Sequence, residues 1–303
     1  MTVVSCKIEA SVGEVIRVLR KWLICVIALC MAFLSAGAEM TEAPVYRALL
    51  VGEREYATDE VADRDGAIHT AEGMRDMLLS LSMDYRVQLA SDIGADELLT
   101  AIDEAYAGAQ AQDVSVFYIN CHGYYENGVA WLLFTDGSTL TAPDLERALR
   151  RIPGTIVVIV DACNSGGFIG RTEENFGAGF VDSFSGAAVA SGLRMSKYKV
   201  ICSSGAEQQS YRLGFNGAPE GSESIATVLA RCLCEGAGWD LIGDKRSAMR
   251  ADVDFDGTVT LSDMAEFLDQ RIEWYLGQTG GTYEQNIQVY PENDGFVLFL
   301  REN

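Results

Sequence analysis

The stretch Thr155-Ile-Val-Val-Ile-Val-Asp-Ala-Cys-Asn-Ser-Gly-Gly167 decides the fold class of this chain. Its first six residues are all β-branched, which is typical of a parallel strand buried on both faces. The run ends in Asp161 and Cys163, and an Asn-Ser-Gly-Gly turn follows. An acid and a thiol are therefore predicted at the carboxyl edge of a sheet, where open α/β sheets bind their ligands.

A second apolar run, VSVFYINC over residues 114–121, has the same design because it leads directly into His122 and Gly123. Of the two histidines in the chain, His69 and His122, only His122 follows a strand. The reactive form of cysteine is the thiolate, which a neighbouring imidazole stabilises or relieves of its proton. We therefore predict His122 and Cys163 as a catalytic pair, with the amides of Gly123 and Cys163 as oxyanion donors.

Segments of alternating strand and helix character surround these two strands. Strands are predicted near residues 46–52, 85–89 and 199–204, and helices near residues 65–81, 95–107, 141–149 and 224–234. This alternation predicts a doubly wound α/β sandwich, with a mostly parallel central sheet and helices on both faces. Residues 165–196 have no sustained period and are expected to form a long irregular loop.

The first 38 residues have the pattern of a secretory signal peptide. Arg17, Arg20 and Lys21 precede a 13-residue apolar core, and Ala36-Gly-Ala38 supplies a small-residue cleavage site. The core is too short to span a membrane. We expect cleavage after Ala38 and a secreted or periplasmic protein with no membrane attachment, and an uncleaved anchor is the alternative.

Charge and cysteine content narrow the possible partners. The formal net charge is −21, and it becomes −23 without the leader, which carries four basic and two acidic residues. So acidic a chain argues against nucleic acid and anionic membranes as partners, and it suits cationic substrates or calcium, although solubility alone also accounts for it.

The cysteines that remain after removal of the leader are Cys121, Cys163, Cys202, Cys232 and Cys234. An odd number implies at least one free thiol. The last three fit small buried hydrophobes, and pairing of Cys232 or Cys234 stays open.

The two motifs Cys121-His-Gly123 and Asp161-Ala-Cys-Asn-Ser-Gly166 resemble the caspase-like clan of cysteine peptidases. This clan includes caspases, metacaspases, clostripain-type enzymes and legumains, and the resemblance covers residues 45–235. It implies a caspase-like sandwich and a Cys-His dyad that cleaves protein or peptide substrates through a thioester. Asn164 departs from the pattern, because metacaspases commonly have His there.

The same resemblance implies a preference at the cleaved position. Metacaspases and clostripain-type enzymes use the acid that corresponds to Asp161 to bind Arg or Lys, whereas caspases, which prefer Asp, have Gln there and arginines around the pocket. We therefore expect cleavage after Arg or Lys, with Asp65 as a second acidic wall or, alternatively, as a helix cap. Ser203 begins a segment that resembles the clan's pocket-lining loop. Related enzymes are often activated by a cut in the loop after the nucleophile, and we expect self-processing near Arg194 or Lys197.

A calcium signature lies near the end of the chain, in Asp252-Val-Asp-Phe-Asp-Gly-Thr-Val-Thr-Leu-Ser-Asp263. This stretch matches the twelve-residue EF-hand loop except that Asp replaces Glu at the last position, as in dockerins. The predicted ligands of a structural Ca²⁺ are Asp252, Asp254, Asp256, Thr258, Thr260 and Asp263. An Asp-rich turn is the alternative, and a single loop makes scaffold docking improbable.

These observations predict a secreted cysteine endopeptidase of four segments: a signal peptide (1–38), a peptidase domain (39–240), a calcium loop with its helix (241–276) and a C-terminal strand that completes the fold (277–303). The main alternative is a catalytically degraded, calcium-binding adhesion or docking protein on the same scaffold. A transpeptidase would use the same thioester and differ only in the acceptor.

Overall fold

A six-stranded sheet with the strand order β14-β8-β7-β3-β1-β2 forms the centre of the protein. The computed structural model describes residues 43–169, 197–214 and 225–302, and all statements below concern these residues. The strands of this sheet are β1 (Tyr46–Gly52), β2 (Tyr85–Ser91), β3 (Val114–Asn120), β7 (Thr155–Asp161), β8 (Tyr198–Cys202) and β14 (Gln288–Tyr290). Every neighbouring pair is parallel except β14 with β8.

Both faces of the sheet are buried, as the β-branched sequence of β7 predicts. Ile156, Val158 and Val160 belong to one apolar core, and Val157 and Ile159 belong to the other. A strand with period-two side chains can serve two cores in this way only if it has no polar face. The sequence of β7 therefore fixes it as a central strand.

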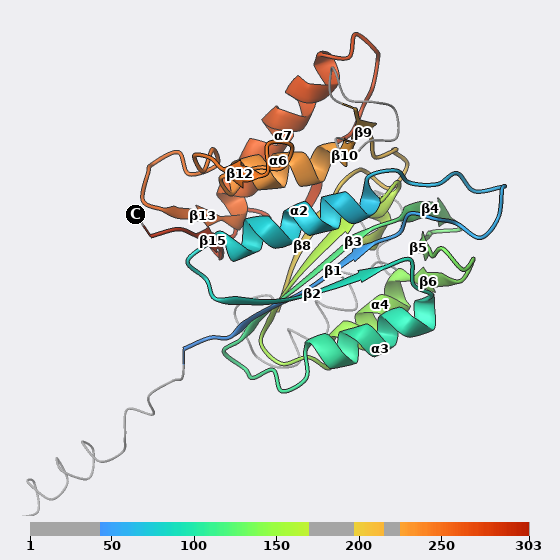
Figure 1. Ribbon diagram of the computed structural model, residues 1–303, viewed down its shortest axis with the longest axis horizontal. Coiled ribbons are helices and arrows are strands. Elements are labelled where there is room, and N and C mark those ends of the chain that lie inside the picture. Colours follow the sequence, from blue (N-terminus) through green and yellow to red (C-terminus); the bar gives the residue numbers. More distant parts are fainter. Residues whose placement is uncertain (1–42, 170–196, 215–224, 303) are drawn as a thin grey trace, which may run out of the picture. The chain divides into compact units, whose positions relative to one another are not determined.

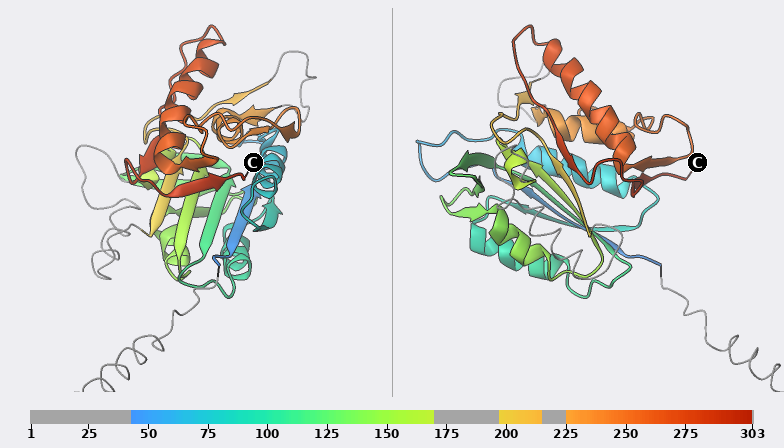
Figure 2. Two further views of the ribbon diagram at one scale, coloured as in Figure 1. Left: turned by 90° about the vertical axis from the view of Figure 1, so that its left-hand side faces the viewer. Right: turned by 180° about the vertical axis from the view of Figure 1, so that it is seen from behind.

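Five described helices cover the sheet. They are α2 (Ala67–Leu79), α3 (Ala95–Ala105), α4 (Ala142–Leu149), α6 (Val228–Gly236) and α7 (Leu261–Gly277). The core on one face contains residues of α2, α6 and α7, and the core on the other contains residues of α3 and α4. Figure 1 and the rear view in Figure 2 show these two helical layers on opposite sides of the strands. The predicted α/β sandwich is confirmed.

The helix starts agree with the sequence in one case and differ in another. Thr141 accepts a hydrogen bond from the backbone of Asp144 at the start of α4, as an N-cap should. Helix α2 instead begins after Gly66, which has a φ of 82° and makes no side-chain cap. Asp65 therefore does not cap α2, because the left-handed glycine takes the cap position.

Short sheets and one 3₁₀ turn complete the fold. The three-stranded sheet β4 (His122–Glu126), β5 (Val129–Leu133) and β6 (Thr139–Thr141) follows β3 directly. The pairs are β9 (Arg212–Leu213) with β10 (Ala226–Thr227), β11 (Trp239–Asp240) with β12 (Lys245–Arg246), and β13 (Thr258–Thr260) with β15 (Val297–Leu300), and the turn is η1 (Ser165–Phe168).

The C-terminal segment, residues 277–303, contains two strands where the sequence predicts one. Strand β15 pairs with β13, and the three residues of β14 join the main sheet. So short a strand has no hydrophobic period by which the sequence would reveal it.

Contacts divide the chain into residues Met1–Ala43 and one unit, Pro44–Asn303, to which all the elements above belong. The predicted leader, with its cleavage site, and Arg194 lie outside the described residues. None of the described helices combines the length and the apolar character that a membrane crossing needs.

Candidate active site

The two sequence motifs meet at the carboxyl ends of β3 and β7. The parallel register pairs Asn120 with Asp161, so His122 and Cys163 each lie two residues beyond the same rung of the ladder. The backbone of Gly123 lies close to that of Cys163, because a Cβ added to Gly123 would lie 2.4 Å from the carbonyl oxygen of Cys163. Only glycine allows this approach between the two strand ends, which explains the residue after His122.

The side chain of His122 is held by the loop that follows β1. Its Nε2 lies 2.7 Å from the carbonyl oxygen of Ala62. Because a carbonyl oxygen only accepts hydrogen bonds, Nε2 carries the proton, and Nδ1 of the neutral ring is the free base. The ring of Tyr56 lies 4.9 Å from the imidazole, centroid to centroid. The phenol of Tyr56 accepts a hydrogen bond from the backbone N–H of His122 and donates one to the carbonyl of Leu133.

The electrostatic surroundings keep His122 neutral. Burial lowers the pKa of the imidazole most, the hydrogen bond to Ala62 raises it, and the positive charges of Arg64 and Arg212 lower it further. A neutral imidazole at neutral pH is the form that can accept a proton.

Cys163 is the one described cysteine that is not buried. Its Sγ accepts a hydrogen bond from the backbone N–H of Ser210 at 3.4 Å and lies 3.8 Å from the carbonyl of the same residue. The thiol is thus half-buried and lies against the segment that follows β8.

Asp161, two residues before Cys163, is fully buried. Its carboxylate accepts hydrogen bonds from the hydroxyls of Tyr118, Thr227 and Ser210. Burial raises the pKa of this carboxyl, and hydrogen bonds and the charge of Arg64 oppose the rise. The resemblance implies that this acid binds Arg or Lys of the substrate, but in the structure the side chain has no exposed surface. The reason is that three hydroxyls from neighbouring elements already surround its oxygens.

Two arginines lie beside the pair instead. Arg64 donates from Nε and Nη2 to the amide oxygen of Asn120, at 3.2 and 2.7 Å. Arg212 donates to the backbone oxygen of Asp65, and its charge interacts with that of Cys163. The amide nitrogen of Asn120 is buried and has no hydrogen-bond partner among the residues that the structure describes.

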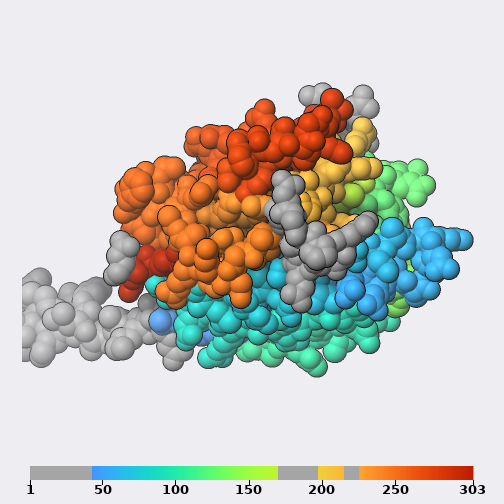
Figure 3. Space-filling view, turned by 45° about the horizontal axis from the view of Figure 1, so that its top comes forward, coloured from blue at the N-terminus to red at the C-terminus, as the bar shows by residue number. Residues whose placement is uncertain are grey.

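The remaining predicted pocket residues have other roles. Ser203 is fully buried, and its hydroxyl donates to the carbonyl of Ala162 and meets the hydroxyl of Ser165. It supports the turn after Cys163 and does not line a surface, which corrects the expectation. Asp65 is half-exposed and contributes its backbone oxygen to the site. Figure 3 shows the segments after β1, around β4 and after β8 gathered at one end of the unit.

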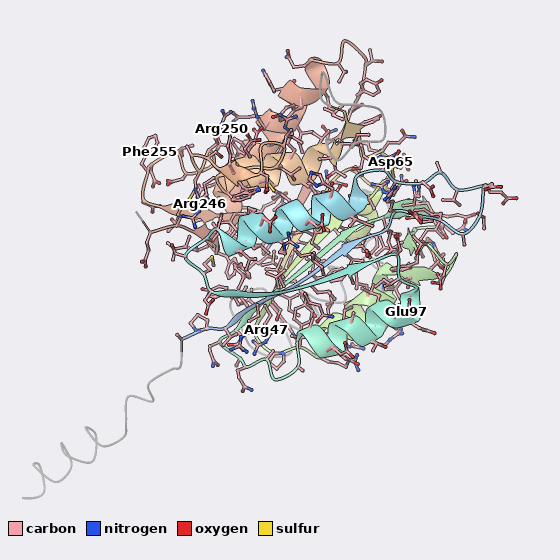
Figure 4. All side chains as sticks on the ribbon, viewed as in Figure 1. Arg47, Asp65, Glu97, Arg246, Arg250 and Phe255 are labelled. Atoms are coloured by element: carbon pink, nitrogen blue, oxygen red, sulfur yellow. The ribbon has the colours of Figure 1, made fainter. Side chains whose placement is uncertain are left out.

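The Asp-rich loop brings together three of its four predicted acidic ligands. One carboxylate oxygen from each of Asp252, Asp254 and Asp256 lies within 4.8 Å of the others. Asp263 is not in this group, because its carboxylate accepts the N–H and hydroxyl of Thr260 in a capping box for α7. Thr258 donates to Asp256. In Figure 4 the label of Phe255, within this loop, lies on the opposite side of the unit from Asp65.

Several residues around His122 could not be found from the sequence. Ala62 acts through its carbonyl, so its side chain carries no signal. Tyr56 and Arg64 lie in irregular segments, and Arg212 begins the two-residue strand β9, so no periodicity assigns these residues to the site. Arg64 is 3% exposed, and a charged residue so buried needs a partner, but this burial is visible only in the structure.

The fold and these strand ends define a cysteine-type peptidase. The family model of the caspase domain matches residues 46–256, so the chain belongs to that family. A crystal structure of caspase-1 from Spodoptera frugiperda is similar, with a TM-score of 0.56, 11% sequence identity and coverage of 86% of this chain and 92% of that chain. At such low identity the likeness shows the fold alone. A search of curated protein sequences finds no match.

Proposed function

We propose that Cys163 is the nucleophile and His122 the general base and acid of an endopeptidase. This proposal is supported by the close approach of the two strand ends, where a Cβ on Gly123 would lie 2.4 Å from the carbonyl oxygen of Cys163, and by the register that sets His122 and Cys163 two residues beyond paired positions. The free Nδ1 of a neutral His122 supports the role of base.

In the proposed reaction, Nδ1 of His122 takes the thiol proton as Sγ of Cys163 attacks the peptide carbonyl. The resulting oxyanion accepts hydrogen bonds from the amides of Gly123 and Cys163, as expected from the sequence. Collapse breaks the C–N bond, and the leaving amine takes the proton from His122. Water then attacks the thioester, gives its proton to His122, and the acid product leaves as the thiol is restored. An amine in place of water would give transpeptidation.

The test is the cleavage of fluorogenic peptides by single variants. Cys163→Ala and His122→Ala should each lower kcat/KM by roughly a thousandfold or more. Cys202→Ala, which removes a buried thiol, and His69→Ala, which removes the other histidine, serve as matched controls. Full activity in Cys163→Ala would overturn the role of Cys163, whereas no cleavage by the wild type would favour the alternative of a calcium-binding adhesion or docking protein.

The preference at the cleaved position is the second part of the proposal. The sequence favours Arg or Lys through Asp161 and Asp65. The carboxylate of Asp161, however, is enclosed by hydroxyls, whereas Arg212 is only half-buried and its charge interacts with that of Cys163. A cation beside the nucleophile favours an anionic group on the ligand. The geometry therefore favours an acidic side chain over the basic one.

A panel of peptides that differ only at the cleaved position decides between the two preferences. We expect faster cleavage after Asp or Glu than after Arg or Lys, and a selective loss of that activity in Arg212→Gln. If Arg and Lys peptides are cleaved best, and Asp161→Asn abolishes that cleavage, the preference expected from the sequence is right.

We also propose that the Asp-rich loop binds Ca²⁺ as a structural ion. The three grouped carboxylates supply the oxygen ligands that this cation takes, and the engagement of Asp263 in a cap suits weak binding. Isothermal titration with CaCl₂ should show one site, and Asp254→Ala should remove it. Heat of binding that is unchanged in Asp254→Ala would place the ion elsewhere.

Export remains a proposal that rests on the leader sequence alone. In N-terminal sequencing of the protein recovered from the medium or periplasm of an expressing bacterium, the sequence should begin after Ala38.

Self-processing is best sought near Arg194, because Lys197 is held just before β8. The carbonyl of Lys197 accepts the backbone N–H of Ile156, and its ammonium donates to the carbonyl of Arg150.

A further inference from the structure

The loop of residues 203–212 contacts the thiol of Cys163. Its Ser210 contacts the sulfur, and the carbonyl of Gln208 accepts the backbone N–H of Asn164 at 2.8 Å. The position of this loop therefore decides what lies around the nucleophile.

The C-terminal segment holds the 203–212 loop through one buried side chain. Gln285, between α7 and β14, is 5% exposed. Its Oε1 accepts the backbone N–H of Tyr211, and its Nε2 donates to the carbonyl of Ser203, both at 2.9 Å. Because an N–H only donates and a carbonyl only accepts, the two partners fix the orientation of the amide. One side chain thus links the two ends of the loop.

Neighbours of Gln285 reinforce the same contact. The backbone N–H of Asn286 donates to the side chain of Gln208 at 3.0 Å. The ring of Tyr283 meets that of Tyr211 edge-on, with centroids 4.9 Å apart. Gln285 itself makes no hydrogen bond to Cys163, so any effect on the thiol passes through the loop.

We propose that Gln285 is a positioning residue of the peptidase, which holds the 203–212 loop against Cys163. This proposal rests on the proposed role of Cys163. A displacement of about 1 Å in such a support can reduce turnover on the order of a hundredfold.

Two substitutions separate the donor from the acceptor of the amide. Gln285→Leu loses both hydrogen bonds, and we expect it to lower kcat/KM about tenfold or more at every pH. Gln285→Glu keeps the acceptor for Tyr211 but sets a carboxylate against the carbonyl of Ser203. At pH 8 it should therefore be as impaired as Gln285→Leu.

The pH dependence of Gln285→Glu gives a readout that a general loss of stability would not produce. Burial raises the pKa of a carboxyl, and the protonated form again donates to the carbonyl of Ser203. The ratio of variant to wild-type kcat/KM should rise as the pH falls from 8 to 5, whereas the ratio for Gln285→Leu should stay flat. Because His122 titrates in the wild type and in both variants, its effect on kcat/KM cancels in both ratios.

Gln288→Glu is the matched control, because the Gln288 side chain bonds only the carbonyl of the adjacent Ile287. It should keep kcat and KM within about twofold of wild type. Thermal unfolding establishes that each variant is folded at the assay temperature. Folded Gln285 variants with wild-type kcat and KM, or a flat ratio for Gln285→Glu, would overturn the proposal.

Alkylation of Cys163 by iodoacetamide, located by peptide mass mapping, separates this proposal from the peptidase proposal. If the wild type cleaves no peptide, the peptidase proposal fails. Even in that case, an alkylation rate constant of Cys163 that changes at least threefold in Gln285→Leu supports the positioning role. An unchanged alkylation rate constant refutes it.

Discussion

At the scale of single residues, Tyr56 is the main support of the candidate base. Tyr56→Phe keeps the ring beside His122 but leaves the backbone N–H of His122 and the carbonyl of Leu133 without their partner. We expect kcat to fall about tenfold with KM little changed, and stability to fall by about 1–2 kcal/mol. Peptide kinetics and denaturant unfolding measure the two effects. Tyr124→Phe, on the adjacent β4, is the control, and equal losses in both variants would contradict the role of Tyr56.

The lowered pKa of His122 sets the acid limit of activity. The base must be neutral to accept the thiol proton, so kcat/KM should rise with pH through the pKa of the folded imidazole. Since burial, Arg64 and Arg212 lower that pKa, the midpoint of the acid limb should lie below about 6.5, the ordinary value for histidine. A pH–rate profile of the wild type measures it, and a midpoint above that value would show that the imidazole is charged more easily than its surroundings imply.

The residues that the sequence identified are those at regular strand ends. His122 and Cys163 follow long apolar runs, so their place at one sheet edge follows from periodicity. The partners of these residues come from loops and short strands: Ala62 acts by its carbonyl, Arg64 lies in an irregular segment, Arg212 lies in the two-residue β9, and Gln285 lies 122 positions further along the chain than Cys163. Such contacts depend on how loops pack, which no local pattern records. The same limit explains why the burial of Asp161 was not foreseen.

At the scale of elements, the start of α7 combines a cap with the proposed calcium loop. Thr260 and Asp263 form a capping box, whereas Asp254 lies in the acidic group. Thr260→Ala should lower the free energy of unfolding by about 1 kcal/mol with calcium or with chelator, because it removes a cap. Asp254→Ala should lower stability only with calcium, since it removes a ligand; without calcium it relieves repulsion among the carboxylates and should not lower stability. Denaturant unfolding in both conditions separates the roles, and calcium-dependent loss in Thr260→Ala alone would reverse the assignment.

At the scale of the whole molecule, a buried ion pair ties the C-terminal segment to the sheet. Lys199 in β8 is paired with Asp294, and their side chains are 1% and 15% exposed. The caspase domain match ends at residue 256, yet this pair and β14 make residues beyond it part of the same fold. The layers in Figure 2 show the C-terminal residues alongside the sheet that β8 belongs to.

Breaking one partner of such a pair leaves a buried charge alone, which costs about 3 kcal/mol or more. Asp294→Asn should therefore lower the free energy of unfolding by about that amount, because the Lys199 ammonium then faces an amide. The double variant with Lys199→Met should recover most of the loss, since neither charge remains. Denaturant unfolding of Asp294→Asn, Lys199→Met and the double variant gives the double-mutant cycle. If Asp294→Asn costs less than about 0.5 kcal/mol, the C-terminal segment is held by β14 and its apolar contacts, and the ion pair is incidental to the fold.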